Sequence, residues 1–471
     1  MRLRFRAFGA RLVKFLMTYS PAFLILMFPA LFNRFPLVYF DTGTYLAAAI
    51  HRFNPIDRPF HYSVFLYALH LRQTLWPIVV AQAAITVGVL AILFDVSLGP
   101  LRALHMATLV AISAAVSSLP VLASEIMPDL FTPLLVCSLV LLALHSLALT
   151  NVRKVFLYAV VLLAICVHQA NFLLACALLL TLALVRSRLK PSLAGPLLAV
   201  CAGFGLLILP NAVSRHHRSF STTRGSSVFM MAKLLDDGIG FDYLDEECKT
   251  IPFSICPELP ILHQERQLFP NPDSSDFFLW GGPLQAAGDW EEVRKYAGFV
   301  VAQCIFRYPA RFFLASVLDA GRQSILLSTG DGIVRYGDDA YVSTTLKSDF
   351  PAAVFDEFQR SRQQSGSLDF AQISKLDICV IILSFVVLGA LAKSLYAADK
   401  RFAATILMLL VGFLANALVM GTLGHPQSRY QNRVSCLIPL AAMMAVGYRL
   451  KAARIAGKIL HHTPAQLEDQ L

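Results

Sequence analysis

Four short polar clusters stand between the long apolar runs of this chain, and each contains side chains that can do chemistry. A carboxylate near a low-dielectric region can have its pKa tuned toward the working pH, which suits it to act as a general base. Arginine presents a planar fork of donors that matches phosphate oxygens. The clusters are Asp41, Tyr45, Asp57, Arg58, His61 and Tyr62; Glu125 and Asp129; His168, Gln169 and Asn171; and His425, Arg429, Tyr430 and Arg433.

The segment from Gly424 to Arg433 gives the strongest indication of function. It is a short polar stretch between two apolar runs, and it holds two arginines and no acid. Short loops carried across a membrane usually avoid arginine. A spacing of four places Arg429 and Arg433 on one face if the segment is helical, which favours anion recognition. The alternative is that both guanidinium groups snorkel to lipid headgroups.

The other polar positions also have structural interpretations. Asp41 can cap a helix that follows it, and Asp129 can complement the dipole of the next helix. Arg58 can belong to a solvated turn, and His168 can be a hydrogen-bonded structural residue. Glu125 stands in a tight turn with apolar flanks, and an acid at membrane depth is a functional candidate.

The composition indicates a membrane protein. Of the 471 residues, 56% are hydrophobic and 15% are charged, whereas soluble domains have about a quarter charged residues. The net charge is +10, but the basic residues lie mainly in short loops between apolar runs, where they set orientation. Nucleic-acid binding is therefore not expected. The chain also has no Walker, GxSxG, HExxH or dinucleotide-binding motif.

The apolar runs predict about ten transmembrane helices. About 20 apolar residues cross a bilayer as a helix. The runs are 13–32, 74–95, 102–120, 130–150, 155–171, 172–187, 193–212, 376–396, 402–422 and 434–450, with one long stretch divided at His168–Asn171. The loops assigned to the inside are basic, which predicts that both termini are cytoplasmic and that all four polar clusters lie outside.

The predicted fold is an all-α polytopic membrane protein with surface helices in its first outer loop and a small mixed extracytoplasmic segment. Its parts are an N-terminal transmembrane module (1–211) with outer loops 33–74 and 120–130, the extracytoplasmic segment (212–375), and a C-terminal transmembrane module with a cytoplasmic tail (376–471). Surface helices are expected at 41–52 and 62–72, and amphipathic ones at 290–308 and 309–327.

The extracytoplasmic segment holds two further features. Cys248 and Cys256 lie in a polar loop, so outside the cytoplasm they can form a disulfide; the alternative is two free thiols. The segment is also rich in aromatic residues, including Trp280 and Trp290. Aromatic rings can stack on sugars, but these are expected to pack into the core of the segment.

At these positions the chain resembles the GT-C superfamily of membrane glycosyltransferases, which use polyprenyl-phosphate-linked sugars. Three motifs carry the likeness: Phe40-Asp41-Thr-Gly-Thr-Tyr45 after the first span, Arg58-Pro59-Phe-His-Tyr62-Ser63 before the second, and Glu125 to Asp129 after the third. The late Arg429-Tyr430 loop is similar to the element that faces the lipid phosphate. Many members pair two acids in the first loop, where this chain has Thr-Gly-Thr after Asp41. A divalent metal therefore stays an open alternative that no paired acidic motif supports, and no other cofactor is predicted.

The resemblance implies an enzyme that transfers a sugar from a polyprenyl-phosphate donor to a lipid or glycan acceptor with inversion. Asp41 is the expected base, and Glu125 or Asp129 positions the acceptor or backs up Asp41. Arg429 and Arg433, with Arg58, hold the donor phosphate. The remaining cleft-lining residues are Tyr45, His61, Tyr62, His168, Gln169, His425 and Tyr430.

The expected location is the bacterial inner membrane, with the site facing the periplasm. The alternative function is a transporter or flippase for a lipid-linked or polar solute. It is favoured by the interrupted apolar run at His168–Asn171, because broken spans often mark binding sites at the bilayer midplane.

Overall fold

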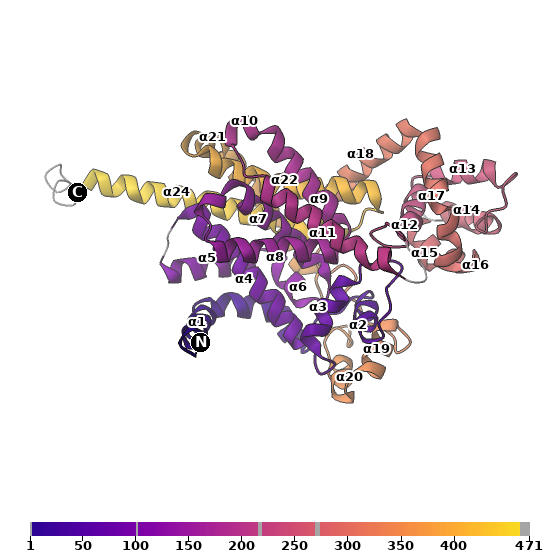
Figure 1. Cartoon of the computed structure of the whole chain (residues 1–471), viewed down its shortest axis with the longest axis horizontal. Helices are drawn as coiled ribbons and strands as arrows, with labels where there is room; N and C mark the ends of the chain where they lie inside the picture. The colour runs from indigo at the N-terminus through magenta and orange to yellow at the C-terminus, as the bar shows by residue number, and fades with distance from the viewer. Residues whose placement is uncertain (1, 100–101, 215–218, 269–273, 462–471) are drawn as a thin grey trace.

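The computed structural model is helical throughout the part of the chain that it describes (Figure 1). It describes residues 2–99, 102–214, 219–268 and 274–461, with the backbone alone at 2–16, 268 and 454–461. The structure within these ranges contains no strand; one isolated bridge joins Leu37 to Glu125.

Five helices in these ranges are long and apolar enough to cross a membrane. They are α4 (Trp76–Leu98), α11 (Ala194–Val213), α21 (Ala371–Ala398), α22 (Lys400–Leu423) and the consecutive α23 (Ser428–Ser435) and α24 (Leu437–His461), whose apolar stretch is Ser428–Ala453. The other helices of the bundle are α1 (Arg2–Asn33), α5 (Ala103–Ala115), α6 (Leu119–Ser124), the 3₁₀ turn η1 (Pro128–Leu130), α7 (Phe131–Leu144), the 3₁₀ turn η2 (Ser146–Ala148), α8 (Asn151–Val167), α9 (Ala170–Leu184) and α10 (Arg186–Leu189).

The ten predicted runs all fall on helices, but several of these helices are short. The 13 residues of α5 extend about 20 Å, against a hydrocarbon core of about 30 Å. The long run of residues 155–187 is divided between α8 and α9, as its polar residues predicted: α8 ends at Val167, before His168.

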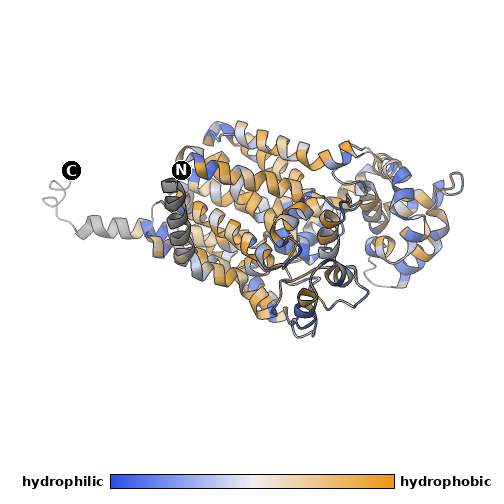
Figure 2. Ribbon diagram, turned by 60° about the horizontal axis from the view of Figure 1, so that its bottom comes forward, coloured by the Kyte–Doolittle hydropathy of each residue, from blue (hydrophilic) through white to orange (hydrophobic). Residues whose placement is uncertain are grey.

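Helix α7 occupies the centre of the bundle. All 14 of its residues are buried, and α4, α8, α9 and α22 pack around it. A helix that is apolar on every side is stable only when it is surrounded in this way. The outer helices expose leucine, valine and phenylalanine side chains, and Figure 2 shows that hydrophobic residues dominate the bundle. These features are compatible with a protein that lies in a membrane.

The segment 212–375 divides into three parts that pack against different regions of the molecule. Six helices form a lobe with a core of its own at the right of Figure 1: α12 (Ser226–Asp236), α13 (Ile239–Glu247), α14 (Leu259–Leu268), α15 (Ser274–Trp280), α16 (Pro283–Ala286) and α17 (Asp289–Arg307), with the 3₁₀ turn η3 (Cys256–Glu258). Helix α18 (Pro309–Ile325) leaves the lobe and packs along α22, whereas α19 (Tyr341–Asp349) packs on α2 and is followed by α20 (Ala352–Gln359). The described part of this segment is therefore all-helical, and the expectation of a mixed segment was wrong.

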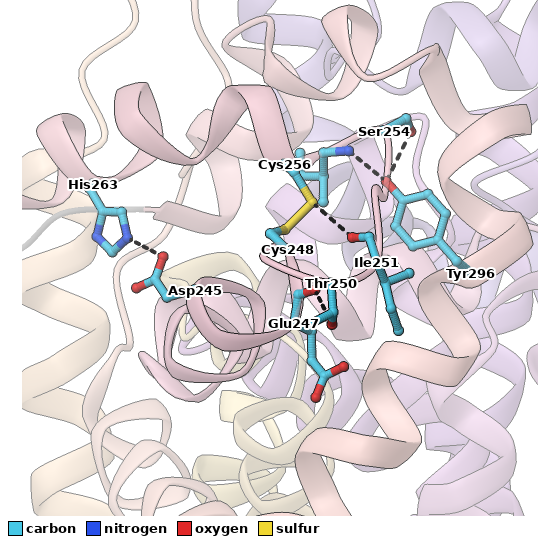
Figure 3. Close-up of a disulfide and its surroundings, with 10 residues drawn as sticks. Asp245, Glu247, Cys248, Thr250, Ile251, Ser254, Cys256, His263 and Tyr296 are labelled. Carbon is cyan, nitrogen blue, oxygen red and sulfur yellow. Dashed lines mark hydrogen bonds and ion pairs between the residues drawn. A yellow bond between two sulfur atoms is a disulfide. The ribbon is translucent and has the colours of Figure 1, made fainter.

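A disulfide joins Cys248 to Cys256 within the lobe (Figure 3). The loop that it closes is also held by the Tyr296 hydroxyl, which accepts a hydrogen bond from the Ile255 backbone N–H at 3.1 Å. Cys248 ends α13 and Cys256 begins the turn before α14. The bridge thus fixes the connection between these two helices.

Two short helices follow α1 at the expected positions, α2 (Thr42–Ile50) and α3 (His61–His70). Helix α2 lies very close to α19, because Gly43 faces the backbone of Val342. A Cβ built on Gly43 would lie 2.7 Å from the Val342 nitrogen. This explains the Thr-Gly-Thr sequence that follows Asp41: only a residue without a side chain permits the contact.

We predict that Gly43→Ala lowers the free energy of unfolding by about 1–3 kcal/mol, because the added methyl forces α19 away from α2. The matched control is Gly205→Ala in α11, where a Cβ meets nothing within 4 Å; alanine there is expected to be neutral or stabilising by up to about 1 kcal/mol. Thermal unfolding of the purified proteins in detergent measures both. An equal change in the free energy of unfolding for the two variants would contradict the close contact between Gly43 and Val342.

Candidate functional site

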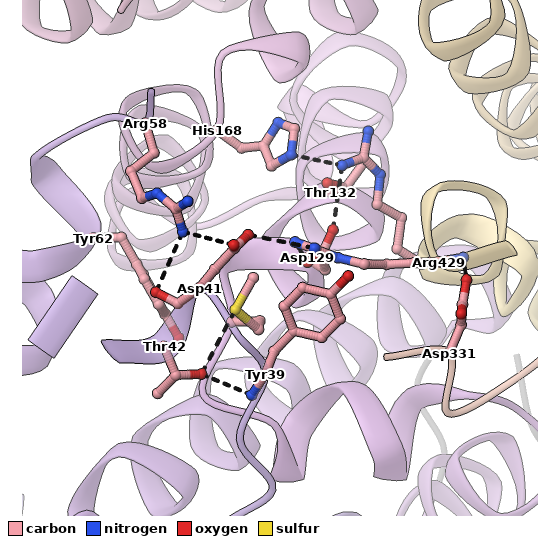
Figure 4. A network of polar contacts seen from close by, with 12 residues as sticks. Tyr39, Asp41, Thr42, Arg58, Tyr62, Asp129, Thr132, His168, Asp331 and Arg429 are labelled. Carbon is pink, nitrogen blue, oxygen red and sulfur yellow. Dashed lines mark hydrogen bonds and ion pairs between the residues drawn. The ribbon is translucent and has the colours of Figure 1, made fainter. Parts of the chain in front are cut away.

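Asp41 is paired with Arg58 in the segment that joins α1 to α2. The residue precedes α2, but its side chain makes no capping hydrogen bond. Instead one carboxylate oxygen forms an ion pair with Arg58 Nη1 at 2.9 Å (Figure 4). Arg58 Nη2 donates to the Asp57 carboxylate at 2.5 Å. The interpretation of Asp41 as a helix cap is therefore wrong. Arg58 is buried, so the solvated turn is wrong as well.

Asp129 binds both arginines of α23. Arg429 approaches one carboxylate oxygen through Nη2 at 3.0 Å and Nε at 3.2 Å, and Arg433 Nη1 lies 3.3 Å from the other oxygen. The spacing of four therefore does place the two guanidinium groups on one side of a helix. Both arginines point inward to a buried carboxylate, so neither snorkels to the surface.

Arg433 is fully enclosed, with 1% of its surface exposed. Its Nη2 and Nε donate to the Asn416 amide oxygen at 2.9 and 3.2 Å, and its Nη1 lies 2.8 Å from His168 Nε2. A guanidinium has no acceptor atom, so His168 must accept through an unprotonated Nε2. His168 and Asn416 thereby fix Arg433, and through it Asp129.

Arg429 connects the two carboxylates. Its Nη1 lies 3.4 Å from the second oxygen of Asp41, and its guanidinium stacks over the Tyr39 ring at 4.1 Å. Its backbone N–H donates to the Asp331 carboxylate at 3.1 Å. Burial favours the neutral form of the Asp41 carboxyl, but Arg58 and Arg429 outweigh this effect and hold its pKa below the ordinary value. Asp41 is therefore ionised at neutral pH.

A cavity of 740 Å³ opens beside this cluster, between the bundle and the lobe. Nine residues of the four polar clusters line it: Asp41, Tyr45, Asp57, Arg58, His168, Gln169, His425, Arg429 and Tyr430. They come from three of the four clusters, and the structure brings them to one place. His425 is also paired with Asp236 of the lobe at 2.8 Å.

The six other cluster residues do not line the cavity: His61, Tyr62, Glu125, Asp129, Asn171 and Arg433. The Tyr62 hydroxyl donates to the Gln82 side chain at 2.9 Å, and the Gln82 amide donates to the backbone oxygen of Glu125 at 2.9 Å. Tyr62 and Glu125 are thus connected through Gln82 and lie outside the cavity lining.

The Glu125 side chain is buried, and its Oε1 has no hydrogen-bond partner among the described residues. Burial and the neighbouring Asp129 charge raise the pKa of Glu125 to about 8. The group is therefore a neutral acid at pH 7, in contrast to the ionised Asp41.

Three contributors were not identified from the sequence. Tyr39 lies two residues before Asp41 and stacks on Arg429, and Asp331 comes from the Gly-Asp-Gly stretch that precedes Ile333. Asn416 is an isolated amide in the apolar run of α22; a polar residue in such a run is itself a signal. The signals for Tyr39 and Asp331 are weak, because aromatic and loop acidic residues are common.

The described residues contain no group of three or more histidine, cysteine or acidic side chains that could hold a metal. Asp41, which lines the cavity, and Asp129, which does not, each have both oxygens paired with guanidinium groups. The residues present therefore do not fit a divalent cation at this position.

No protein-family model, curated protein or solved structure matches this chain. The function must therefore be argued from the residues of the site.

We predict that Glu125→Gln changes the pH dependence of stability. Because the folded chain holds the Glu125 proton up to about pH 8 and the unfolded chain loses it near 4.5, the native protein should lose stability as pH rises across this interval. The glutamine variant lacks this loss, so its stability relative to the native protein should rise from pH 5 to pH 8 and then level off. Unfolding measured at several pH values, with the exposed Glu357→Gln as control, tests this; parallel curves for all three proteins would contradict it.

Proposed function

We propose that this chain is an integral membrane glycosyltransferase of the GT-C type, with about ten spans and both termini in the cytoplasm. It transfers a sugar from a polyprenyl-phosphate donor to an acceptor on the outer side of the membrane, with inversion. The observation that supports the proposal is the pairing of an ionised carboxylate, Asp41, with a guanidinium, Arg429, in the lining of one cavity. These are the two kinds of group that a general base and a phosphate-binding residue require.

The cavity offers an apolar wall for the lipid part of such a donor. This wall comes from helices α9, α11 and α22 and consists of Phe172, Leu173, Phe204, Met420 and Leu423. Phe172 and Phe204 stack at 4.1 Å between ring centres. An isoprenoid chain can lie on these side chains while its phosphate reaches Arg429, because apolar surface and a guanidinium then lie side by side.

In the proposed step, an acceptor hydroxyl attacks the anomeric carbon of the donor sugar. The bond between that carbon and the phosphate oxygen breaks, and its electron pair leaves with the polyprenyl phosphate. The hydroxyl proton passes to the Asp41 carboxylate. Arg429 and Arg58 stabilise the charge that develops on the leaving phosphate. A single displacement of this kind inverts the configuration.

The other charged residues have a supporting role in this proposal. Asp129 and Arg433 are buried and do not line the cavity. They orient Arg429 and keep its guanidinium directed toward Asp41. This differs from the expectation that Arg433 touches the phosphate and that Asp129 acts on the acceptor. Glu125, neutral and enclosed, has no direct part in the step.

We predict that Asp41→Asn lowers transfer by about 10²–10⁴-fold, the usual contribution of a general base, without loss of protein from the membrane. The assay follows radiolabelled sugar from a set of polyprenyl-phosphate donors into the envelope glycans of membranes that contain the chain. The control is Asp245→Asn, a surface acid of the lobe paired with His263, which should keep full activity. Unchanged turnover in Asp41→Asn would show that Asp41 is not the base.

The same protein in sealed vesicles distinguishes the transferase from a transporter. Sugar transfer without net movement of the lipid-linked sugar across the bilayer supports the proposal. Movement without transfer would replace it with the alternative of a transporter or flippase.

A further inference from the structure

The lobe contributes a second wall to the cavity, and one tryptophan of this wall is unusually exposed. Trp280 lines the cavity with 51% of its surface exposed, although Phe278, two residues earlier, is fully buried. Trp290 is partly buried and packs against Phe229 at 5.1 Å. The expectation that the aromatic residues of this segment pack into a core therefore holds for Phe278 but not for Trp280.

The backbone explains why the Trp280 indole lies outside the core of the lobe. Helix α15 ends at Trp280, and Gly282 follows with φ of +113°, a conformation that side chains rarely adopt. The chain turns away directly after the tryptophan. The indole remains at the end of the helix, where it packs against Trp290 at 5.8 Å between ring centres and lines the cavity.

The polar groups that line the cavity together with Trp280 include a carboxylate and hydroxyls. Asp276 lies one turn earlier on α15, lines the cavity and accepts from the Gln427 amide at 3.3 Å. Ser226 and Thr222 also line it, and both donate to the Gln169 side-chain oxygen, at 3.4 and 3.0 Å. An aromatic face beside a carboxylate and several hydroxyls matches the apolar ring face and the hydroxyl groups of a sugar.

This lobe wall carries no uncompensated positive charge among the residues that line it. Lys233 is its one basic residue, and its ammonium is paired with Asp319 at 2.5 Å and with Asp237. A phosphate or carboxylate ligand therefore has no free cation on this side. Arg58 and Arg429 line the cavity from the bundle, so the bundle residues and the lobe residues favour different ligand chemistry.

We propose that the wall formed by Trp280, Asp276 and Ser226 binds the acceptor, and that the acceptor is a saccharide. Its ring stacks on the Trp280 indole and one of its hydroxyls donates to Asp276, while another hydroxyl faces Asp41 across the cavity. That this saccharide is the acceptor rests on the proposed transferase function. Saccharide binding itself does not rest on that function, because it requires only the residues of the wall.

Saturation-transfer NMR on the purified full chain in detergent, without any lipid donor, tests this directly. The probes are four trisaccharides: maltotriose, mannotriose, chitotriose and galactotriose. At least one should receive saturation from the protein, and Trp280→Ala should weaken its binding by about tenfold or more, since a stacked ring is lost. Trp280→Phe should recover part of the affinity. The matched control is Phe299→Ala, which truncates another lobe aromatic of equal exposure, 50%, outside the cavity lining, and should bind as the native chain does.

The proposal is overturned if none of the four trisaccharides binds, or if Trp280→Ala and Phe299→Ala bind equally well. The outcome for the saccharide site is independent of the outcome for the transferase function. If the chain binds a saccharide but transfers sugar from no lipid donor, the saccharide site is supported and the transferase function is refuted. If the chain transfers sugar but binds none of the trisaccharides, the transferase function is supported and the saccharide site is refuted.

Discussion

The carboxylate of Asp129 is shared by two guanidinium groups, and the arrangement of the site depends on this interaction. Arg429 and Arg433 lie 300 and 304 residues after Asp129 in the sequence, so the contact joins the N-terminal and C-terminal parts of the bundle. All three side chains are buried or nearly so. Removing one partner of such a network leaves a buried charge without compensation, which costs about 3–5 kcal/mol. The network therefore fixes where Arg429 and Asp41 meet.

The two acids that are bound by the same arginine are suited to different roles because of their surroundings. Asp129 is enclosed, whereas Asp41 keeps 22% of its side chain exposed and borders the cavity. A group must reach a substrate to accept its proton, so Asp41 is the acid that can do chemistry. The proposed transferase uses Asp129 to hold the arginine and Asp41 to take the proton. Glu125 is buried like Asp129 but has no arginine partner, and its carboxyl group is therefore neutral.

Much of the helix layout and part of the site could be predicted from the sequence. Hydropathy and helix periodicity are local properties, and they located α2, α3, α17 and α18 to within a few residues. The spacing of Arg429 and Arg433 is also local, and it predicted their common direction. The partner of these arginines is not local: nothing near Asp129 indicates that α23 will pack beside η1. The same limit applies to segment 212–375, where the composition did not indicate that α18 and α19 leave the lobe, or that Trp280 faces a cavity.

The central claim is that Asp129 and Arg433 form one coupled, buried unit, and a double-mutant cycle measures this most directly. Asp129→Asn, Arg433→Gln and the combined variant are compared with the native chain by thermal unfolding in detergent. The structure predicts that the double variant is more stable than the sum of the single effects by about 1–3 kcal/mol, since it leaves neither charge unpaired. If the changes in the free energy of unfolding add to within about 0.5 kcal/mol, Asp129 and Arg433 act independently. The coupled, buried unit would then not exist.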